Sequence, residues 1–136
     1  MEVDHLDLIK MNQIINTPNA PAPIGPYNQA VIANGFLFMS GQIAINPATG
    51  EIEQSSVAEE THQVMRNIKA VLLEASYGFE DVVKVSIFLA DMGLFAEVNE
   101  IFGSYFTGNY PARETVAVKG LPKGVNVEIS MTAYKC

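Results

Sequence analysis

The chain is organised around one stretch near its C-terminal end, Tyr110-Pro-Ala-Arg-Glu-Thr-Val-Ala-Val-Lys-Gly-Leu-Pro-Lys-Gly-Val-Asn-Val-Glu-Ile-Ser130. Its pattern predicts two strands joined by a turn at residues 121–124, forming a β-hairpin. The first strand opens with Arg113, one of two arginines in the protein, and the second carries Glu128 within an apolar alternation. A guanidinium and a carboxylate on one hairpin indicate a site for a small anion with a base nearby.

The alternation in the second strand predicts which side chains share a face of the sheet. One face would carry Val125, Val127, Ile129, Met131 and Ala133, and the other Asn126, Glu128, Ser130, Thr132 and Tyr134. Because the first set is apolar, we expect it to pack against helices. Glu128 is therefore expected on the face of the sheet that points away from the helices.

The N-terminal half predicts strands, a loop and a helix. Gln13–Asn16 fits a short edge strand, and four prolines between residues 17 and 26 exclude a helix there. Asn34-Gly35 separates strands at 29–33 and 36–40, as in a two-residue hairpin. Ser56 is expected to cap a helix whose apolar face runs through Val64 and Ile68 to Ala75.

The next two elements complete the order ββαβαββ. A strand at 82–90 is rich in β-branched residues, and simple alternation places Val83 on the helix side and Val82 on the other side. A second helix is expected after Asp91 and up to Gly108.

This order predicts an α+β fold with a mixed sheet and two helices packed on one face, because helices between single strands require crossover connections. The other face combines polar and apolar residues. Phe36-Leu-Phe-Met39 is continuously apolar, which is typical of a strand covered on both faces. We therefore expect neighbouring subunits to cover this second face. The residue pattern leaves two, three or six subunits open.

Length and charge limit the classes of function. The chain of 136 residues is long enough for one domain, assigned to residues 13–136, with residues 1–12 as an N-terminal extension. Its net charge of −7 and its scattered basic residues disfavour nucleic acid as a partner.

Cysteine, histidine and hydropathy patterns suggest a cytoplasmic protein without metal. Cys136 is the single cysteine, so no intrachain disulfide is expected and a reducing compartment is favoured. His5 and His62 are far apart, and no Cys/His cluster accompanies them, so no metal site is expected. No run reaches the roughly 18 apolar residues that a membrane span requires.

Eight pieces of the chain, in order, resemble the RidA/YjgF imine deaminase family. They are Ile24-Gly-Pro-Tyr-Asn-Gln-Ala30, Ser40-Gly-Gln-Ile43, Asn46-Pro-Ala-Thr-Gly50, Asn67-Ile-Lys-Ala-Val71, Val82-Val-Lys-Val85, Phe95-Ala-Glu-Val-Asn99, Tyr110-Pro-Ala-Arg113 and Leu121-Pro-Lys-Gly-Val-Asn-Val-Glu-Ile129. Each piece is a weak signal, but together they cover nearly the whole chain from about residue 16 to residue 134. The resemblance implies a chorismate-mutase-like fold and a homotrimer with active sites between subunits. It also implies hydrolysis of reactive 2-imino acids, such as 2-iminobutanoate and 2-iminopropanoate, to 2-oxo acids and ammonia without a cofactor.

The resemblance also assigns the two main site residues. Arg113 would bind the substrate carboxylate through its planar fork of donors, which a lysine cannot reproduce. Glu128 would position and deprotonate the attacking water. The alternative roles are a structural salt bridge for Arg113 and an interface ion pair for Glu128. Arg66, on the solvated face of the first helix, has no such motif and serves as a comparison.

Further substrate-binding residues follow from the same match. Tyr27 would close the pocket, Ser40 and Gly41 would line it, and Asn99 would contribute an amide. From residue type alone, Tyr27 could be a packing aromatic, Ser40 a strand-end residue and Asn99 a helix-surface amide.

The chain departs from the family where Arg-Ser-Cys is common, because Glu114 and Thr115 stand in place of the serine and cysteine. The missing thiol argues against covalent catalysis by cysteine, whereas Thr115 keeps the backbone groups of that position. Glu114 could compete for Arg113, although strand alternation predicts that it points the other way. Two other functions stay open: a non-catalytic trimer that binds small carboxylates or a partner, and a translation inhibitor or ribonuclease.

Overall fold

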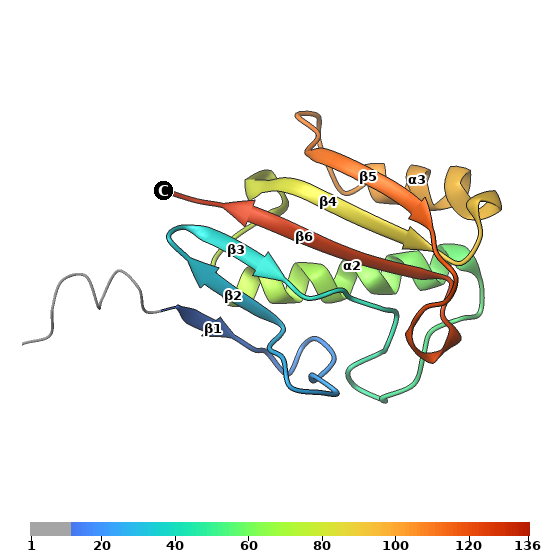
Figure 1. Ribbon diagram of the computed structural model, residues 1–136, viewed down its shortest axis with the longest axis horizontal. Helices are drawn as coiled ribbons and strands as arrows, with labels where there is room; N and C mark the ends of the chain where they lie inside the picture. The colour runs from blue at the N-terminus through green and yellow to red at the C-terminus, as the bar shows by residue number, and fades with distance from the viewer. Residues whose placement is uncertain (1–11) are drawn as a thin grey trace, which may run out of the picture.

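The computed structural model describes residues 12–136 (Figure 1). Apart from Asn12, the predicted extension lies outside the described residues. The elements are β1 (Gln13–Ile15), β2 (Ala30–Ala33), β3 (Phe36–Met39), α2 (Val57–Glu74), β4 (Val82–Leu89), α3 (Phe95–Gly103), β5 (Ala112–Ala117) and β6 (Val127–Tyr134). The predicted order ββαβαββ is confirmed from β2 to β6, and β1 is the predicted short edge strand.

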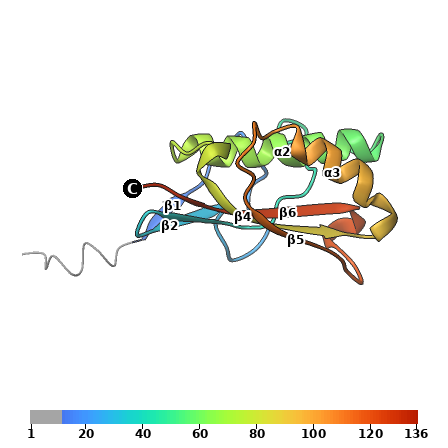
Figure 2. The same cartoon turned by 90° about the horizontal axis from the view of Figure 1, so that it is seen from above.

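All six strands form one mixed sheet in the order β1-β2-β3-β6-β4-β5. β4 pairs with β5 in parallel, and the other neighbours are antiparallel. Both helices lie on the same face of this sheet, as the edge-on view shows (Figure 2). The predicted α+β fold is therefore confirmed.

The prediction that β5 and β6 form a hairpin is wrong, because β4 lies between them and pairs with both. The connection between them crosses the end of β4: Val118 N donates to Leu89 O, and Ala90 N donates to Asn126 O. Residues 121–124 do turn, with Pro122–Gly124 in a short 3-10 helix. Alternation identifies a strand, but it carries no information on which strand pairs with it, and this explains the error.

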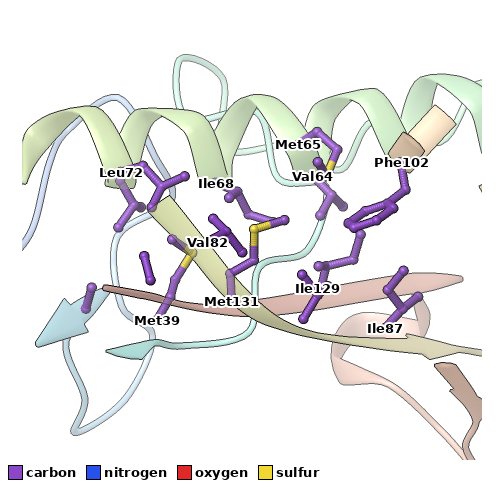
Figure 3. Packing of buried hydrophobic residues seen from close by; sticks show 14 of the residues in the cluster. Met39, Val64, Met65, Ile68, Leu72, Val82, Ile87, Phe102, Ile129 and Met131 are labelled. Carbon is purple, nitrogen blue, oxygen red and sulfur yellow. The ribbon is translucent and has the colours of Figure 1, made fainter. Parts of the chain in front are cut away.

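The core fills the space between α2 and the sheet (Figure 3). Val64, Ile68 and Leu72 of α2 pack towards Ile129 and Met131 of β6, and all five side chains are buried. The helix begins as predicted, since the side chain of Ser56 accepts from Glu59 N at 3.0 Å. The predicted inner face of β6 is thus confirmed, and Glu128 lies on the opposite face.

Two local predictions are corrected. The register of β4 against β6 shifts between Val82 and Lys84, so Val82 is buried and Val83 is 45% exposed, the reverse of simple alternation. Asp91 caps the short turn Met92–Leu94, and the second helix ends at Gly103 instead of Gly108. Beyond Gly103 the chain forms four-residue turns, such as the one closed by the hydrogen bond from Phe106 N to Gly103 O.

The tight turn between β2 and β3 is confirmed, with φ of 53° at Asn34 and 86° at Gly35, as a type I′ hairpin requires. β3 alternates between exposed and buried residues, so one chain covers only one of its faces. The second face of the sheet leaves five large side chains exposed: Ile14, Phe36, Phe38, Val116 and Tyr134. What covers this face stays a prediction.

No helix within residues 12–136 has the length and apolar character that crossing a bilayer requires.

Candidate functional site

Arg113 lies at the wall of an open hollow of about 480 Å³, which we call the Arg113 hollow. Its lining comes from α3, the following loop and β5: Asn99, Phe102, Gly103, Tyr110, Pro111 and Arg113. Two of these residues, Arg113 and Asn99, were predicted from separate sequence motifs. The fold brings them into direct contact.

The side chain of Arg113 is held in place without an acidic partner. Its Nη1 donates to Asn99 Oδ1 at 2.7 Å, and its guanidinium carbon lies 5.7 Å and 5.4 Å from the ring centres of Phe95 and Phe102. Within residues 12–136 the only salt bridge joins Lys84 and Glu114. Because a guanidinium has five N–H donors, Arg113 keeps donors for an anion from outside the chain.

Glu114 points away from Arg113, as predicted. Its carboxylate lies 2.6 Å from Lys84 Nζ and accepts a hydrogen bond from Ser86 Oγ. These contacts, the one from Lys84 first, hold the pKa of Glu114 below its ordinary value. Glu114 therefore does not compete for Arg113 in this chain.

Thr115 follows on the same face of β5 as Arg113, since both pair with inward-facing residues of β4, Ile87 and Val85. Its Oγ1 is the one buried side-chain oxygen or nitrogen among the described residues without a hydrogen-bond partner. Buried polar atoms normally have a partner. Thr115 is therefore an exception to that rule, and it does not line the Arg113 hollow.

Glu128 lies in a second hollow of about 60 Å³, the Glu128 hollow. Tyr27, Gly41 and Glu128 line it, together with Pro21, Ala22, Ile24, Gln29, Gln42, Ile43, Ile45 and Pro122. Burial raises the pKa of Glu128 above its ordinary value of 4.5. A carboxylate with a raised pKa is a stronger base, which suits a group that takes a proton from water.

Gly41 lies directly against the carboxylate of Glu128. A Cβ at this position would lie 2.5 Å from Glu128 Oε2 and 2.8 Å from its carboxyl carbon. The match to the family placed this glycine in the lining of the pocket. In the structure it lets the backbone approach the proposed base, and so determines where that carboxylate lies.

Gly41→Ala is therefore expected to displace the Glu128 carboxylate and to lower the imine hydrolysis that the family resemblance implies about 10²-fold, the scale of a misplaced catalytic group. Since the displaced atoms end a flexible side chain, the free energy of unfolding should change by less than about 1 kcal/mol. Steady-state kinetics and urea unfolding measure the two effects. Gly120→Ala is the matched control, because a Cβ there meets nothing within 4 Å. Unchanged kinetics in Gly41→Ala would contradict the role given to Gly41.

The loop that carries Tyr27 is held by Gln29, a residue that was not predicted to belong to the site. Gln29 is buried, and its Nε2 donates to the carbonyls of Thr17, Ala20 and Pro21. Proline-rich loops leave carbonyls without backbone donors, so an amide side chain directly after such a loop was the available signal. Gln29 therefore supports the wall of the Glu128 hollow.

Ser40 and Tyr27 make contacts within the same loop region. Ser40 Oγ donates to Asn28 O at 2.7 Å, and Tyr27 OH accepts from Ile24 N at 3.2 Å. Tyr27 is also 46% exposed and lines the Glu128 hollow. Ser40 thus contacts the loop, whereas Tyr27 can reach a ligand.

Arg113 and Glu128 lie on opposite faces of the sheet, which corrects the idea that one hairpin carries both. Arg113 pairs with the buried, helix-side Val85, and Glu128 pairs with the outward Phe88. Their strands are separated by β4, about 10 Å across two strand spacings. One chain therefore holds two half-sites, a guanidinium half-site and a carboxylate half-site, that cannot grip the same small molecule.

Comparison with known proteins gives consistent matches along the chain. A family model described as Endoribonuclease L-PSP matches residues 17–135. A RutC family protein of Pyrococcus horikoshii is 50% identical over 125 residues, which are 92% of this chain and 99% of that protein. The human 2-iminobutanoate/2-iminopropanoate deaminase is 42% identical over 125 residues, 92% of this chain and 91% of the human protein.

Solved structures match as well. The crystal structure of E. coli TdcF with bound serine superposes with a TM-score of 0.87 at 37% identity, covering 91% of this chain and 99% of that one. The chorismate-mutase-like arrangement of sheet and helices is thereby confirmed. With these matches over nearly its whole length, the chain belongs to the RidA/YjgF/L-PSP (RutC) family.

Proposed function

We propose that this protein hydrolyses reactive 2-imino acids, such as 2-iminobutanoate and 2-iminopropanoate, to 2-oxo acids and ammonia. The observation that carries the proposal is the pair of half-sites: a guanidinium without an acidic partner among the described residues, and a carboxylate whose pKa is raised. The human relative at 42% identity bears the name of this activity, and TdcF was solved with serine, a small amino acid, bound.

In the proposed mechanism, Arg113 binds the carboxylate of the imino acid with the donors that Asn99 leaves free. The backbone groups of Thr115, two residues along the same face, are a further proposed contact for the substrate. This grip holds the iminium carbon still while water attacks it. The reaction needs no cofactor, and none is proposed.

Glu128 takes the proton from water as the oxygen attacks the iminium carbon, which forms a neutral carbinolamine. The protonated Glu128 then gives that proton to the amine nitrogen. The carbon–nitrogen bond breaks, the hydroxyl loses its proton to Glu128, and Glu128 passes this proton to the departing ammonia, so that the 2-oxo acid and ammonium leave. Iminium and water are thus converted to 2-oxo acid and ammonium, and Glu128 is returned unchanged.

Since Arg113 and Glu128 point to opposite faces of the sheet in one chain, we assign them to a site shared by two subunits of a homotrimer. The Arg113 hollow of one subunit faces the Glu128 hollow of its neighbour in this arrangement. The exposed side chains of Phe36, Phe38 and Tyr134 support a partner on the second face of the sheet. The cytoplasm is the proposed compartment, in line with the lone cysteine, Cys136.

Two other functions predict different results. A non-catalytic carboxylate-binding protein would bind 2-oxo acids at Arg113 without accelerating ammonia release. A ribonuclease would cleave RNA in a manner that depends on these residues, although the net charge of −7 opposes phosphate binding. The same purified protein can be assayed for all three activities.

Arg113→Ala tests the proposal directly. A threonine dehydratase generates 2-iminobutanoate in the assay mixture, and the wild-type protein should accelerate the release of ammonia from it. We expect Arg113→Ala to lower kcat/KM about 10²-fold, because the substrate loses the group that orients it. Arg66→Ala, on the exposed side of α2, is the matched control and should stay active. Full activity of Arg113→Ala would exclude the assignment.

A further inference from the structure

Glu60 is a buried carboxylate that the proposed mechanism does not use. It lies in the first turn of α2 and is only 1% exposed. Charged side chains are rarely buried to this degree without a partner, because an ion loses its hydration there. No cation pairs with it, since the only salt bridge within residues 12–136 joins Lys84 and Glu114. The contacts that compensate its burial therefore indicate what Glu60 does.

The carboxylate of Glu60 accepts three hydrogen bonds, all from the two residues that precede Glu128. Its Oε2 accepts from Asn126 N at 2.8 Å and from Val127 N at 3.1 Å. Its Oε1 accepts from Asn126 Nδ2 at 2.9 Å. Hydrogen bonds to an ionised acceptor are stronger than those between neutral groups. Glu60 thus fixes the start of β6 to the start of α2.

On this edge of β6, Glu60 takes the place of a neighbouring strand. N–H groups two residues apart in a strand point to the same edge, and Ile129 N donates to Gln42 O on the edge away from β4. Val127 N points to that edge as well, and Glu60 is its acceptor. The strand on that side, β3, pairs with β6 at residues 132–134, well beyond this point. The buried N–H of Val127 therefore depends on Glu60.

The position of the Glu128 carboxylate depends on this attachment, because Glu128 follows Val127 directly. Its carboxylate lies so close to Gly41 that a Cβ there would be 2.5 Å from Oε2. A small shift at the start of β6 would therefore move the carboxylate relative to the backbone of Gly41. Misplacing a catalytic group by about 1 Å can lower a rate about 10²-fold.

We infer that Glu60 is a positioning residue, which determines where the Glu128 carboxylate lies in the Glu128 hollow by holding Asn126 and Val127. For its effect on rate, the inference rests on the proposed deaminase function, to which it adds a residue from α2. Glu60 acts through Glu128 and does not touch the substrate. The length of its side chain and its acceptor oxygens matter for this role, whereas its charge does not.

Glu60→Gln and Glu60→Asp separate the length of the side chain from its charge. Glutamine keeps the length and an oxygen that can accept from both backbone N–H groups, and the Asn126 amide can turn to pair with its NH2 group. Aspartate keeps the charge but is one methylene shorter, so the contacts to Asn126 and Val127 lengthen. We expect kcat for 2-iminobutanoate to stay within about threefold of wild type in Glu60→Gln and to fall at least about tenfold in Glu60→Asp.

The comparison of kcat with KM distinguishes positioning from general damage to the fold. KM should stay within about twofold of wild type in both variants, because Glu60 does not bind the substrate. Glu59→Ala, which removes an exposed acid from the same turn of α2, is the matched control and should keep full activity. A kcat of Glu60→Asp less than about tenfold below that of Glu60→Gln, or a raised KM, would overturn the inference.

Asn126→Ala replaces Glu60→Asp if the shorter acid does not fold. It removes the contact to Oε1 alone, from a half-buried side chain. A fall in kcat of about threefold or more at unchanged KM supports the inference, and a smaller fall overturns it.

A titration of Glu128 tests the inference without any activity. If wild type does not accelerate the hydrolysis, the deaminase proposal is wrong, but the carbon-13 signal of the Glu128 carboxyl, assigned with Glu128→Gln, still reports its position. Burial raises the pKa of Glu128 above 4.5, so a displaced carboxylate should titrate closer to 4.5. We expect a lower midpoint in Glu60→Asp than in Glu60→Gln. The negative charge that Glu60→Asp keeps acts in the opposite direction. An equal or higher midpoint in Glu60→Asp would therefore overturn the inference.

Discussion

Glu128→Gln is expected to lower kcat/KM for 2-iminobutanoate by about 10²–10⁴-fold, because an amide cannot take the proton from the attacking water. The activity of the wild-type protein should fall as the pH is lowered, because Glu128 becomes protonated. Since burial raises the pKa of Glu128 above 4.5, the midpoint of that fall should lie above pH 4.5. The residual activity of Glu128→Gln should lack this fall. Stopped assays of ammonia release across the pH range measure both.

The pH dependence of stability gives an independent check, because stability should decline with rising pH where activity rises. Because the pKa of Glu128 is higher in the folded state, the folded protein binds this proton more tightly than the unfolded chain does. The contribution of Glu128 to stability therefore declines as pH rises through the window that starts near 4.5 and ends at the raised pKa. Glu128→Gln lacks this decline and should be no less stable than wild type at neutral pH. A variant that is inactive because it is unfolded would contradict the assignment.

Mixing two inactive variants is expected to restore about one quarter of the wild-type activity, if the site is shared between subunits. The pair is Arg113→Ala and Glu128→Gln, refolded together in equal amounts so that subunits exchange at random. Each shared site needs an intact Arg113 from one chain and an intact Glu128 from the next. Half of the chains carry each intact group, so about a quarter of the sites have both, whatever the number of subunits.

The control for the mixing experiment pairs variants from the same half-site. Arg113→Ala mixed with Asn99→Ala places both changes in the Arg113 hollow. Because the contact between Arg113 and Asn99 forms within one chain, mixing two chains that each lack one of these residues cannot restore it. The activity of that mixture should be no higher than the average of the activities of the two variants measured alone. An Arg113→Ala and Glu128→Gln mixture that stays as inactive as its components would mean that each chain builds its own site.

Local patterns in the sequence were sufficient for much of the fold. The alternation of β6 placed Glu128 outward and Ile129 inward, because side-chain direction in a regular strand depends only on position. Asn34-Gly35 predicted its hairpin, since the two positive φ angles favour these residue types. The eight motif pieces identified the family, and the comparisons confirm it.

The limits of the sequence appear where a feature depends on contacts between distant segments. The register shift in β4 buries Val82 and exposes Val83, the reverse of what alternation predicts. A bulge of this kind has no signal in an alternating apolar run. The contact of Gly41 with the Glu128 carboxylate joins residues 87 positions apart, counted from 41 to 128, and only the folded sheet brings them together.

Arg113 and Glu128 show most clearly which features follow from local patterns and which depend on contacts between distant segments. The motifs of this family predicted a guanidinium and a carboxylate on two strands that follow one another along the chain. Only the folded sheet shows that β4 lies between those strands and that the two groups point to opposite faces. The physical reason is that side-chain direction follows from local backbone geometry, whereas strand pairing depends on which distant segments bury their apolar surface together.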